Sequence, residues 1–259
     1  MSEDLLYEIR EGIGYVTFNR PQARNSFTFE MYETLGKICR EAGDDFSLRA
    51  LVFTGAGEKA FAAGTEVSQF KSFSTDDDIL EYEARIERVI GSLERCRVPT
   101  IAAISGACTG GGFTIAGCCD LRIASANARF GVPIARTLGN CLSMSNYLRL
   151  TALLGPARVK DLIFTARLIG AEEARAIGLV GEILPDYQSL QQRAQELAGT
   201  VASQAPLTLR ATKEALRRIK ERMNPGEDRD LILSCYMSND FREGLDAFLN
   251  KRPPKWTGK

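Results

Sequence analysis

The sequence contains no histidine. This absence excludes a serine or cysteine nucleophile activated by histidine, and it excludes a metal ion held by imidazole nitrogens. The seven cysteines are an odd number and lack the spacing of metal ligands, so we expect no metal site. Any general acid or base must therefore be a carboxyl group, a thiol, a phenol, an amine or a water molecule.

An excess of charge of either sign is also missing. Lysine and arginine together number 33, as do aspartate and glutamate, so the net charge is zero. We therefore expect neither a nucleic-acid partner nor an anionic membrane surface. The chain also lacks an apolar run of the ~18 residues that cross a membrane, and its start lacks the order of a signal peptide. With cysteines in mostly apolar surroundings, these absences predict a protein of the reducing cytoplasm.

Strand patterns and helix patterns alternate along most of the chain. This alternation indicates an α/β fold with parallel strand pairing, and the length favours one such domain with an appendage. Near residue 200 the pattern becomes entirely helical, which divides a core (residues 1–200) from a helical region (residues 201–259). The predicted strands are 5–9, 13–18, 50–54, 100–104, 121–124, 128–130 and 180–184, and the predicted helices include 29–43, 77–96, 157–165 and 171–177.

The stretch from Pro99 to Asp120 is the most informative. A buried strand, Thr100–Ile104, leads through a turn at Ser105–Thr109 into three glycines, Gly110–Gly112, which begin a helix. Glycines at a helix start let a negatively charged oxygen approach the unpaired N–H groups, so one interpretation is an oxyanion-binding helix terminus. The other is that the glycines only let helix and strand pack closely. The three glycines alone leave both open.

A second loop of small residues, 55–66, follows the predicted strand 50–54. With this pair of loops and further motifs in the same order, the chain resembles the crotonase superfamily of enoyl-CoA hydratases and isomerases over essentially its full length. The motifs are Asn19-Arg20-Pro21 with Ala23 and Asn25, Lys59 to Glu66, Gly106 to Asp120, Phe130-Gly131-Val132-Pro133, Ala174 to Val180, and Arg242 to Pro253.

The resemblance implies a spiral of repeated ββα units, followed by a C-terminal helical region that mediates trimers or dimers of trimers. It implies an acyl-CoA thioester as substrate, with no cofactor beyond the coenzyme A moiety. In this family two backbone N–H groups bind the thioester oxygen, and they fall here on Thr65 and Gly111. Coenzyme A contacts carried over from the family fall on Lys59, Ala60, Ala62, Phe248 and Lys251.

The chain departs from the family where hydratases carry two glutamates that hold water and move protons. Those positions, which face the substrate pocket, are occupied by Thr114 and Ile134. Neither side chain exchanges a proton at neutral pH. The standard hydratase mechanism is therefore in doubt, although the oxyanion donors persist because they belong to the backbone.

Other groups near the expected pocket are candidates for the missing chemistry. Cys141 is interpreted either as a thiolate whose pKa a helix start lowers or as a small buried thiol. Arg136 either binds an acidic acyl group or faces solvent. Glu66 lies beside the first oxyanion donor, and in the family this position often points away from the chemistry. Tyr147 and Tyr236 are further proton carriers that the sequence does not place.

Three functional hypotheses follow. The leading one is an acyl-CoA enzyme that stabilises a thioester enolate, an enoyl-CoA hydratase or isomerase whose proton carrier differs from the usual glutamates. The second is a hydrolase or lyase of the same superfamily that uses Cys141 or a bound water. The third is a catalytically silent acyl-CoA-binding subunit.

Overall fold

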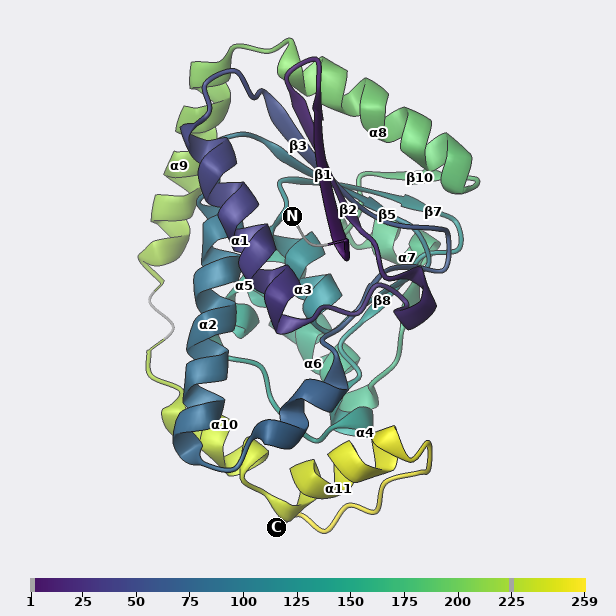
Figure 1. Cartoon of the computed structure of the whole chain (residues 1–259), viewed down its shortest axis with the longest axis vertical. Coiled ribbons are helices and arrows are strands. Elements are labelled where there is room, and N and C mark those ends of the chain that lie inside the picture. The colour runs from purple at the N-terminus through teal and green to yellow at the C-terminus, as the bar shows by residue number, and fades with distance from the viewer. Residues whose placement is uncertain (1–2, 224–225) are drawn as a thin grey trace.

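Two β-sheets form the framework of the protein, in a computed structural model that describes residues 3–223 and 226–259 (Figure 1). The larger sheet has the order β1-β2-β3-β5-β7-β10, and the smaller has the order β4-β6-β8-β9. The strands are β1 (Leu5–Arg10), β2 (Ile13–Phe18), β3 (Ala50–Gly55), β4 (Ala60–Ala63), β5 (Thr100–Ile104), β6 (Ala107–Thr109), β7 (Leu121–Ser125), β8 (Arg129–Gly131), β9 (Ile169–Gly170) and β10 (Glu182–Leu184).

Helices cover both faces of the larger sheet. The helices of the described residues are α1 (Phe29–Asp44), α2 (Asp76–Glu94), α3 (Gly111–Cys118), α4 (Ile134–Thr137), α5 (Met144–Leu154), α6 (Pro156–Thr165), α7 (Ala171–Ala176), α8 (Tyr187–Ala202), α9 (Pro206–Glu221), α10 (Arg229–Tyr236) and α11 (Asn239–Leu249), with short 3-10 helices η1 (Pro21–Ala23) and η2 (Val67–Ser72). Figure 1 shows α8 on one side of this sheet and α1, α2 and α3 on the other.

The sheets are built by a repeated unit of two strands and a helix. In β3-β4-α2, β5-β6-α3 and β7-β8-α4, the first strand joins the larger sheet and the second joins the smaller sheet. Strands of successive units pair in parallel. The expected α/β spiral of ββα units is therefore confirmed.

The sequence analysis was wrong about two segments that it read as a loop and a turn. β4 and β6 lie there and pair in parallel from Ala60↔Ala107 to Ala63↔Thr109. β4 is Ala-Phe-Ala-Ala and β6 is Ala-Cys-Thr, so both strands are short and lack the β-branched run that marks a strand in a sequence. β10 is also shorter than predicted, because it begins at Glu182 rather than at residue 180.

The strongly periodic helices were predicted well. Thr28 caps α1, where its hydroxyl accepts a hydrogen bond from the Met31 amide at 3.2 Å. α2 begins one residue earlier than expected, because Thr75 and Asp78 form a reciprocal capping box. The predicted core boundary at residue 200 falls inside the last turn of α8, which runs on to Ala202.

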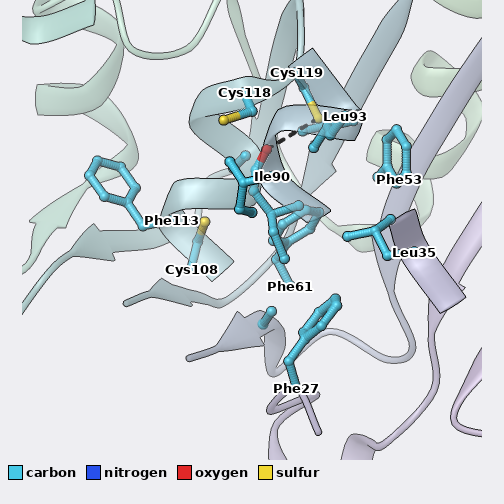
Figure 2. Packing of buried hydrophobic residues seen from close by; sticks show 14 of the residues in the cluster. Phe27, Leu35, Phe53, Phe61, Ile90, Leu93, Cys108, Phe113, Cys118 and Cys119 are labelled. Carbon is cyan, nitrogen blue, oxygen red and sulfur yellow. Dashed lines mark hydrogen bonds between the residues drawn. The ribbon is translucent and has the colours of Figure 1, made fainter. Parts of the chain in front are cut away.

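Aromatic rings and thiols fill the core beneath the two small-residue loops (Figure 2). Phe18 packs edge-to-face against Phe27 at 4.7 Å and against Phe61 at 5.1 Å between ring centroids. The seven cysteines are all free. Burial raises the pKa of the Cys118 and Cys119 thiols to about 12, so these two side chains act as small apolar groups rather than as nucleophiles.

Within the described part of the chain, no helix has both the length and the apolar character needed to cross a membrane.

Candidate active site

The small-residue loop of residues 55–66, which is the first of the two in chain order, turns sharply after β4. Gly64 has a φ of +91°, which glycine adopts without strain. The Phe27 amide donates to the Gly64 carbonyl at 2.8 Å, and the Glu66 amide donates to the Phe27 carbonyl at 2.8 Å. This parallel bridge holds Gly64 and Glu66, the two neighbours of Thr65, in place. Among the described residues, no group accepts a hydrogen bond from the Thr65 N–H.

The second loop has the same form at the end of β6. Gly110 has a φ of +54°, and its amide donates to the Gly131 carbonyl at 3.1 Å. Gly111 is the first residue of α3, a position whose N–H has no acceptor within the helix. No acceptor for this N–H occurs elsewhere among the described residues. Both predicted oxyanion donors are therefore free to bind a ligand.

The two loops touch. A Cβ added to Gly110 would lie 3.4 Å from Gly64 Cα, and one added to Gly111 would lie 2.2 Å from Tyr32 Oη and 3.3 Å from Thr65 Oγ1. Gly112 differs, because a Cβ there would lie 2.2 Å from the Ala62 carbonyl oxygen. The close-packing interpretation therefore applies to Gly112, whereas Gly110 and Gly111 bring the two unpaired N–H groups close together, as the oxyanion interpretation requires.

The packing role of Gly112 predicts that Gly112→Ala lowers the free energy of unfolding by about 1–3 kcal/mol, because the Ala62 backbone cannot move aside without disturbing β4. Gly117→Ala in the same helix is the matched control. Its Cβ would meet only Leu153 at 3.9 Å, so this change is expected to be neutral or to stabilise by up to ~1 kcal/mol. Urea unfolding of the two variants measures the difference, and equal midpoints would contradict the packing role.

Both loops open onto a cavity of about 190 Å³. Thr114 and Ile134 lie in its wall and are buried, as predicted for substrate-pocket residues. The cavity also reaches Phe248 on α11, so the chain's own C-terminal helix closes over its own pocket. The remaining wall is formed by Tyr32, Ala63, Gly64, Thr65, Val67, Phe70, Tyr82, Glu83, Ile86, Ile90, Thr109, Gly110, Gly111, Pro133, Thr137, Leu138, Asn140, Cys141, Leu142, Asn146 and Tyr236.

One carboxyl group in this wall, that of Glu83 on α2, was missed by the sequence analysis. The Tyr236 hydroxyl donates to Glu83 Oε1 at 2.7 Å. Burial raises the pKa of Glu83 to about 7; the hydrogen bond from Tyr236 acts in the opposite direction. A signal was present, because Glu83 lies four residues after Ile79 and three before Ile86, on the buried face of the helix. A carboxylate on an apolar helix face is unusual without a partner or a function.

Of the two tyrosines considered as proton carriers, only Tyr236 lines the cavity. Cys141 also lines it, but of its two interpretations the one with a lowered pKa is wrong. Ser143 rather than Cys141 caps α5, and the Cys141 thiol instead donates to the Leu231 carbonyl at 3.5 Å. Burial is the main cause that raises the pKa of Cys141, and the neighbouring Cys235 is the next. The raised pKa favours the small-thiol interpretation.

Two other candidates do not face the cavity. Arg136 is exposed, because Ile134 and Leu138 form the inner side of α4 and Arg136 lies on the other side; its prediction as a pocket residue is wrong. Glu66 pairs with Arg20 at 3.4 Å and accepts hydrogen bonds from Ser68 and Ser26. Burial opposes ionisation of Glu66, but these partners prevail and lower its pKa. Its role is to hold the first loop.

The predicted coenzyme residues divide between several places. Lys59 and Ala60 line an open groove of about 420 Å³ that also contains Arg24. Phe248 lines the cavity and is 49% exposed. Ala62 is fully buried and packs against α3, and Lys251 is exposed; neither lines the cavity or the groove. Their contacts with coenzyme A stay predictions.

Comparison with known proteins agrees with this fold and site. The family model described as enoyl-CoA hydratase/isomerase matches residues 8–259. The chain is 35% identical to the short-chain-enoyl-CoA hydratase of Clostridium acetobutylicum, with 94% of each chain covered. It is 32% identical to the crotonyl-CoA hydratase of Syntrophomonas wolfei, with 99% of each covered. The crystal structure of an enoyl-CoA hydratase/carnithine racemase from Magnetospirillum magneticum superimposes with a TM-score of 0.82 at 28% identity, over 100% of this chain and 97% of that one.

These matches identify an enzyme that acts through the crotonase fold. The chain belongs to the enoyl-CoA hydratase/isomerase family.

Proposed function

We propose that this enzyme binds a short-chain acyl-CoA thioester and stabilises its enolate through the backbone N–H groups of Thr65 and Gly111. The observation that carries the proposal is the meeting of these two unpaired donors at the wall of one cavity. A thioester enolate places full negative charge on one oxygen, and each preorganised donor contributes about 3–4 kcal/mol to its stabilisation in comparable sites.

The size of the cavity supports a small acyl group. At about 190 Å³ it is little larger than the ~150 Å³ engineered cavity that holds one benzene molecule. Two of the relatives are named as a short-chain-enoyl-CoA hydratase and a crotonyl-CoA hydratase, which agrees with this size. We therefore place hydration or isomerisation of an enoyl group of about four to six carbons first among the reactions of this enzyme.

The coenzyme moiety is proposed to lie along the groove of Lys59 and Ala60, where Arg24 and Lys59 supply positive charge for its phosphates. Phe248 then covers the thioester end of the coenzyme, and Lys251 adds a further cation on the same tail.

The helical region is proposed to mediate the homotrimer, or dimer of trimers, of this enzyme. α9 and the turn after it leave large apolar side chains exposed, which indicates a surface that a second copy covers. These are Leu207 (74%), Leu216 (63%), Ile219 (61%) and Met223 (59%).

The proposed function is tested by incubating the protein in deuterated buffer with crotonyl-CoA, 3-hexenoyl-CoA and butyryl-CoA, and with 2-dodecenoyl-CoA as the long-chain control. Mass spectrometry follows hydration, double-bond migration and deuterium at the α-carbon. We expect turnover or exchange with the short substrates, and at least tenfold less with the long one because the cavity is small. Tight binding of all four without any exchange would instead favour a silent acyl-CoA-binding protein.

A further inference from the structure

The cavity holds a carboxyl group although both usual glutamate positions lack one. Among the described residues of its wall, Glu83 alone carries a carboxyl group; the other ionisable side chains there are the phenols of Tyr32, Tyr82 and Tyr236 and the thiol of Cys141. Glu83 enters from α2, whereas Thr114 and Ile134 belong to α3 and α4. The carboxyl group therefore reaches the same space from a different helix.

The position of Glu83 is fixed from two sides. Ile79 and Ile86 are buried one turn before and after it, so α2 directs its side chain inward. The Tyr236 hydroxyl donates to Glu83 Oε1 at 2.7 Å, and the Asn140 side-chain amide donates to the same hydroxyl at 3.0 Å. The Asn140 amide donates to the Tyr236 oxygen, so that oxygen acts as an acceptor toward Asn140. The single hydroxyl proton of Tyr236 is therefore directed at Glu83.

We propose that Glu83 is the catalytic acid and base of this enzyme, replacing the two glutamates absent at positions 114 and 134, and that Tyr236 and Asn140 are its positioning residues. The inference rests on the proposed function, since it assigns the proton carrier for the enolate that Thr65 and Gly111 stabilise.

A single carboxyl group suits a proton shift within the substrate. From a 3-enoyl thioester, the Glu83 carboxylate takes the C2 proton; the C2–H electron pair becomes the C1=C2 bond, and the thioester C=O pair moves to the oxygen held by the two N–H groups. As that carbonyl re-forms, the C1=C2 pair becomes C2=C3, and the former C3=C4 pair takes the proton back from Glu83 at C4. The product is the 2-enoyl thioester, and no other reactant is consumed.

The surroundings of Glu83 keep both protonation states accessible. Burial is the main reason that its pKa is raised to about 7, and the nearby carboxylates of Asp228 and Glu87 add to it. A carboxyl group with this pKa both accepts and returns a proton at neutral pH. Among the described residues, the charged or titratable groups that face it are Glu87 and Tyr82 on α2, Tyr32 on α1, Cys141, and Asp228 and Tyr236 at the two ends of α10. Glu87 in turn pairs with Arg149 on α5.

The test compares Glu83→Gln with Glu81→Gln, which removes an exposed carboxylate two residues away on the same helix. With 3-hexenoyl-CoA we expect Glu83→Gln to lower kcat at least 10²-fold and to leave KM within about threefold, while Glu81→Gln leaves both unchanged. A Glu83→Gln variant with kcat within threefold of wild type would overturn the proposal. So would a variant in which only KM rises, because Glu83 would then recognise the acyl group and not move its protons.

The pH profile gives a second readout. For the wild type, kcat/KM is expected to rise with pH through about 7 as the Glu83 carboxylate forms. Tyr236→Phe removes the donor that favours the carboxylate, so this limb is expected to move to higher pH. An unmoved limb would overturn the positioning role of Tyr236.

Chemical rescue distinguishes catalysis from a structural role. If Glu83→Gln unfolds, Glu83→Ala is assayed with and without added formate. Formate is expected to raise the rate of this variant at least tenfold, and an unchanged rate would overturn the proposal.

A wild-type enzyme that binds acyl-CoA without exchange, isomerisation or hydration would overturn the proposed function and the role of Glu83 with it. An active wild type with an equally active Glu83→Gln would overturn the role of Glu83 alone.

Discussion

Gly111→Pro, made in a Tyr32→Phe background, is expected to lower kcat for acyl-CoA turnover by about 10²–10³-fold, because it removes one of the two proposed oxyanion donors. The background is needed since any Cβ at Gly111 would lie 2.2 Å from Tyr32 Oη, whereas the next ring atom, Cζ, is 3.5 Å away. Proline is well tolerated at the first residue of a helix, where Gly111 stands.

Gly111→Ala in the same background is the matched control, because alanine adds the Cβ and keeps the N–H. We expect it to retain kcat within about tenfold of the Tyr32→Phe parent, so the difference between the two variants reports the hydrogen bond alone. Circular dichroism and thermal melting confirm that both are folded. Equal activity of the proline and alanine variants would refute Gly111 as an oxyanion donor.

Arg149→Met is expected to lower the free energy of unfolding by about 3–5 kcal/mol. The Arg149 side chain is only 7% exposed and lies 2.6 Å from the Glu87 carboxylate and 2.9 Å from that of Glu94. Removing the guanidinium leaves two carboxylates close together in a partly buried site, where Lys220 still pairs with Glu94. This cluster joins α5 and α9 to α2, the helix that carries Glu83.

The exposed ion pair of Lys37 with Glu41 provides the control for Arg149. Its side chains are 69% and 63% exposed, so Lys37→Met is expected to change stability by less than about 1 kcal/mol. Chemical unfolding in urea measures both variants. If Arg149→Met lowered the free energy of unfolding by less than ~1 kcal/mol, hydration of the two carboxylates would be shown to replace the lost interaction with the guanidinium.

Most helices and the strands of the larger sheet were predictable because the spacing of their apolar residues distinguishes a helix from a strand. In the smaller sheet β8 was predicted, but β4 and β6 were not, because they are short and their pairing depends on neighbouring strands rather than on their own side chains. The same limit appears in the site. Thr65 and Gly111 were placed through the resemblance, because backbone donors depend on loop form.

The side-chain chemistry of the site was harder to predict. Arg136 lies two residues from the inward-facing Ile134, which on a helical turn places it on the opposite side. The pKa of Cys141 depends on burial and on Cys235, a residue far away in the sequence. Glu83 was not predicted because the inner face of α2 was assigned from its apolar residues alone, and Glu83 is a charged residue on that face.

The two proposed oxyanion donors occupy equivalent positions in consecutive repeats of the fold. Ala63 at the end of β4 pairs with Thr109 at the end of β6, and Thr65 and Gly111 each follow their strand by two residues. Neighbouring strands lie about 4.7–4.9 Å apart. Two N–H donors at that separation can each lie about 2.9 Å from one shared oxygen atom. The spacing between parallel strands thus sets the distance between the two N–H groups of the proposed oxyanion site. A chain that keeps these two turns in register keeps that distance whatever its side chains are.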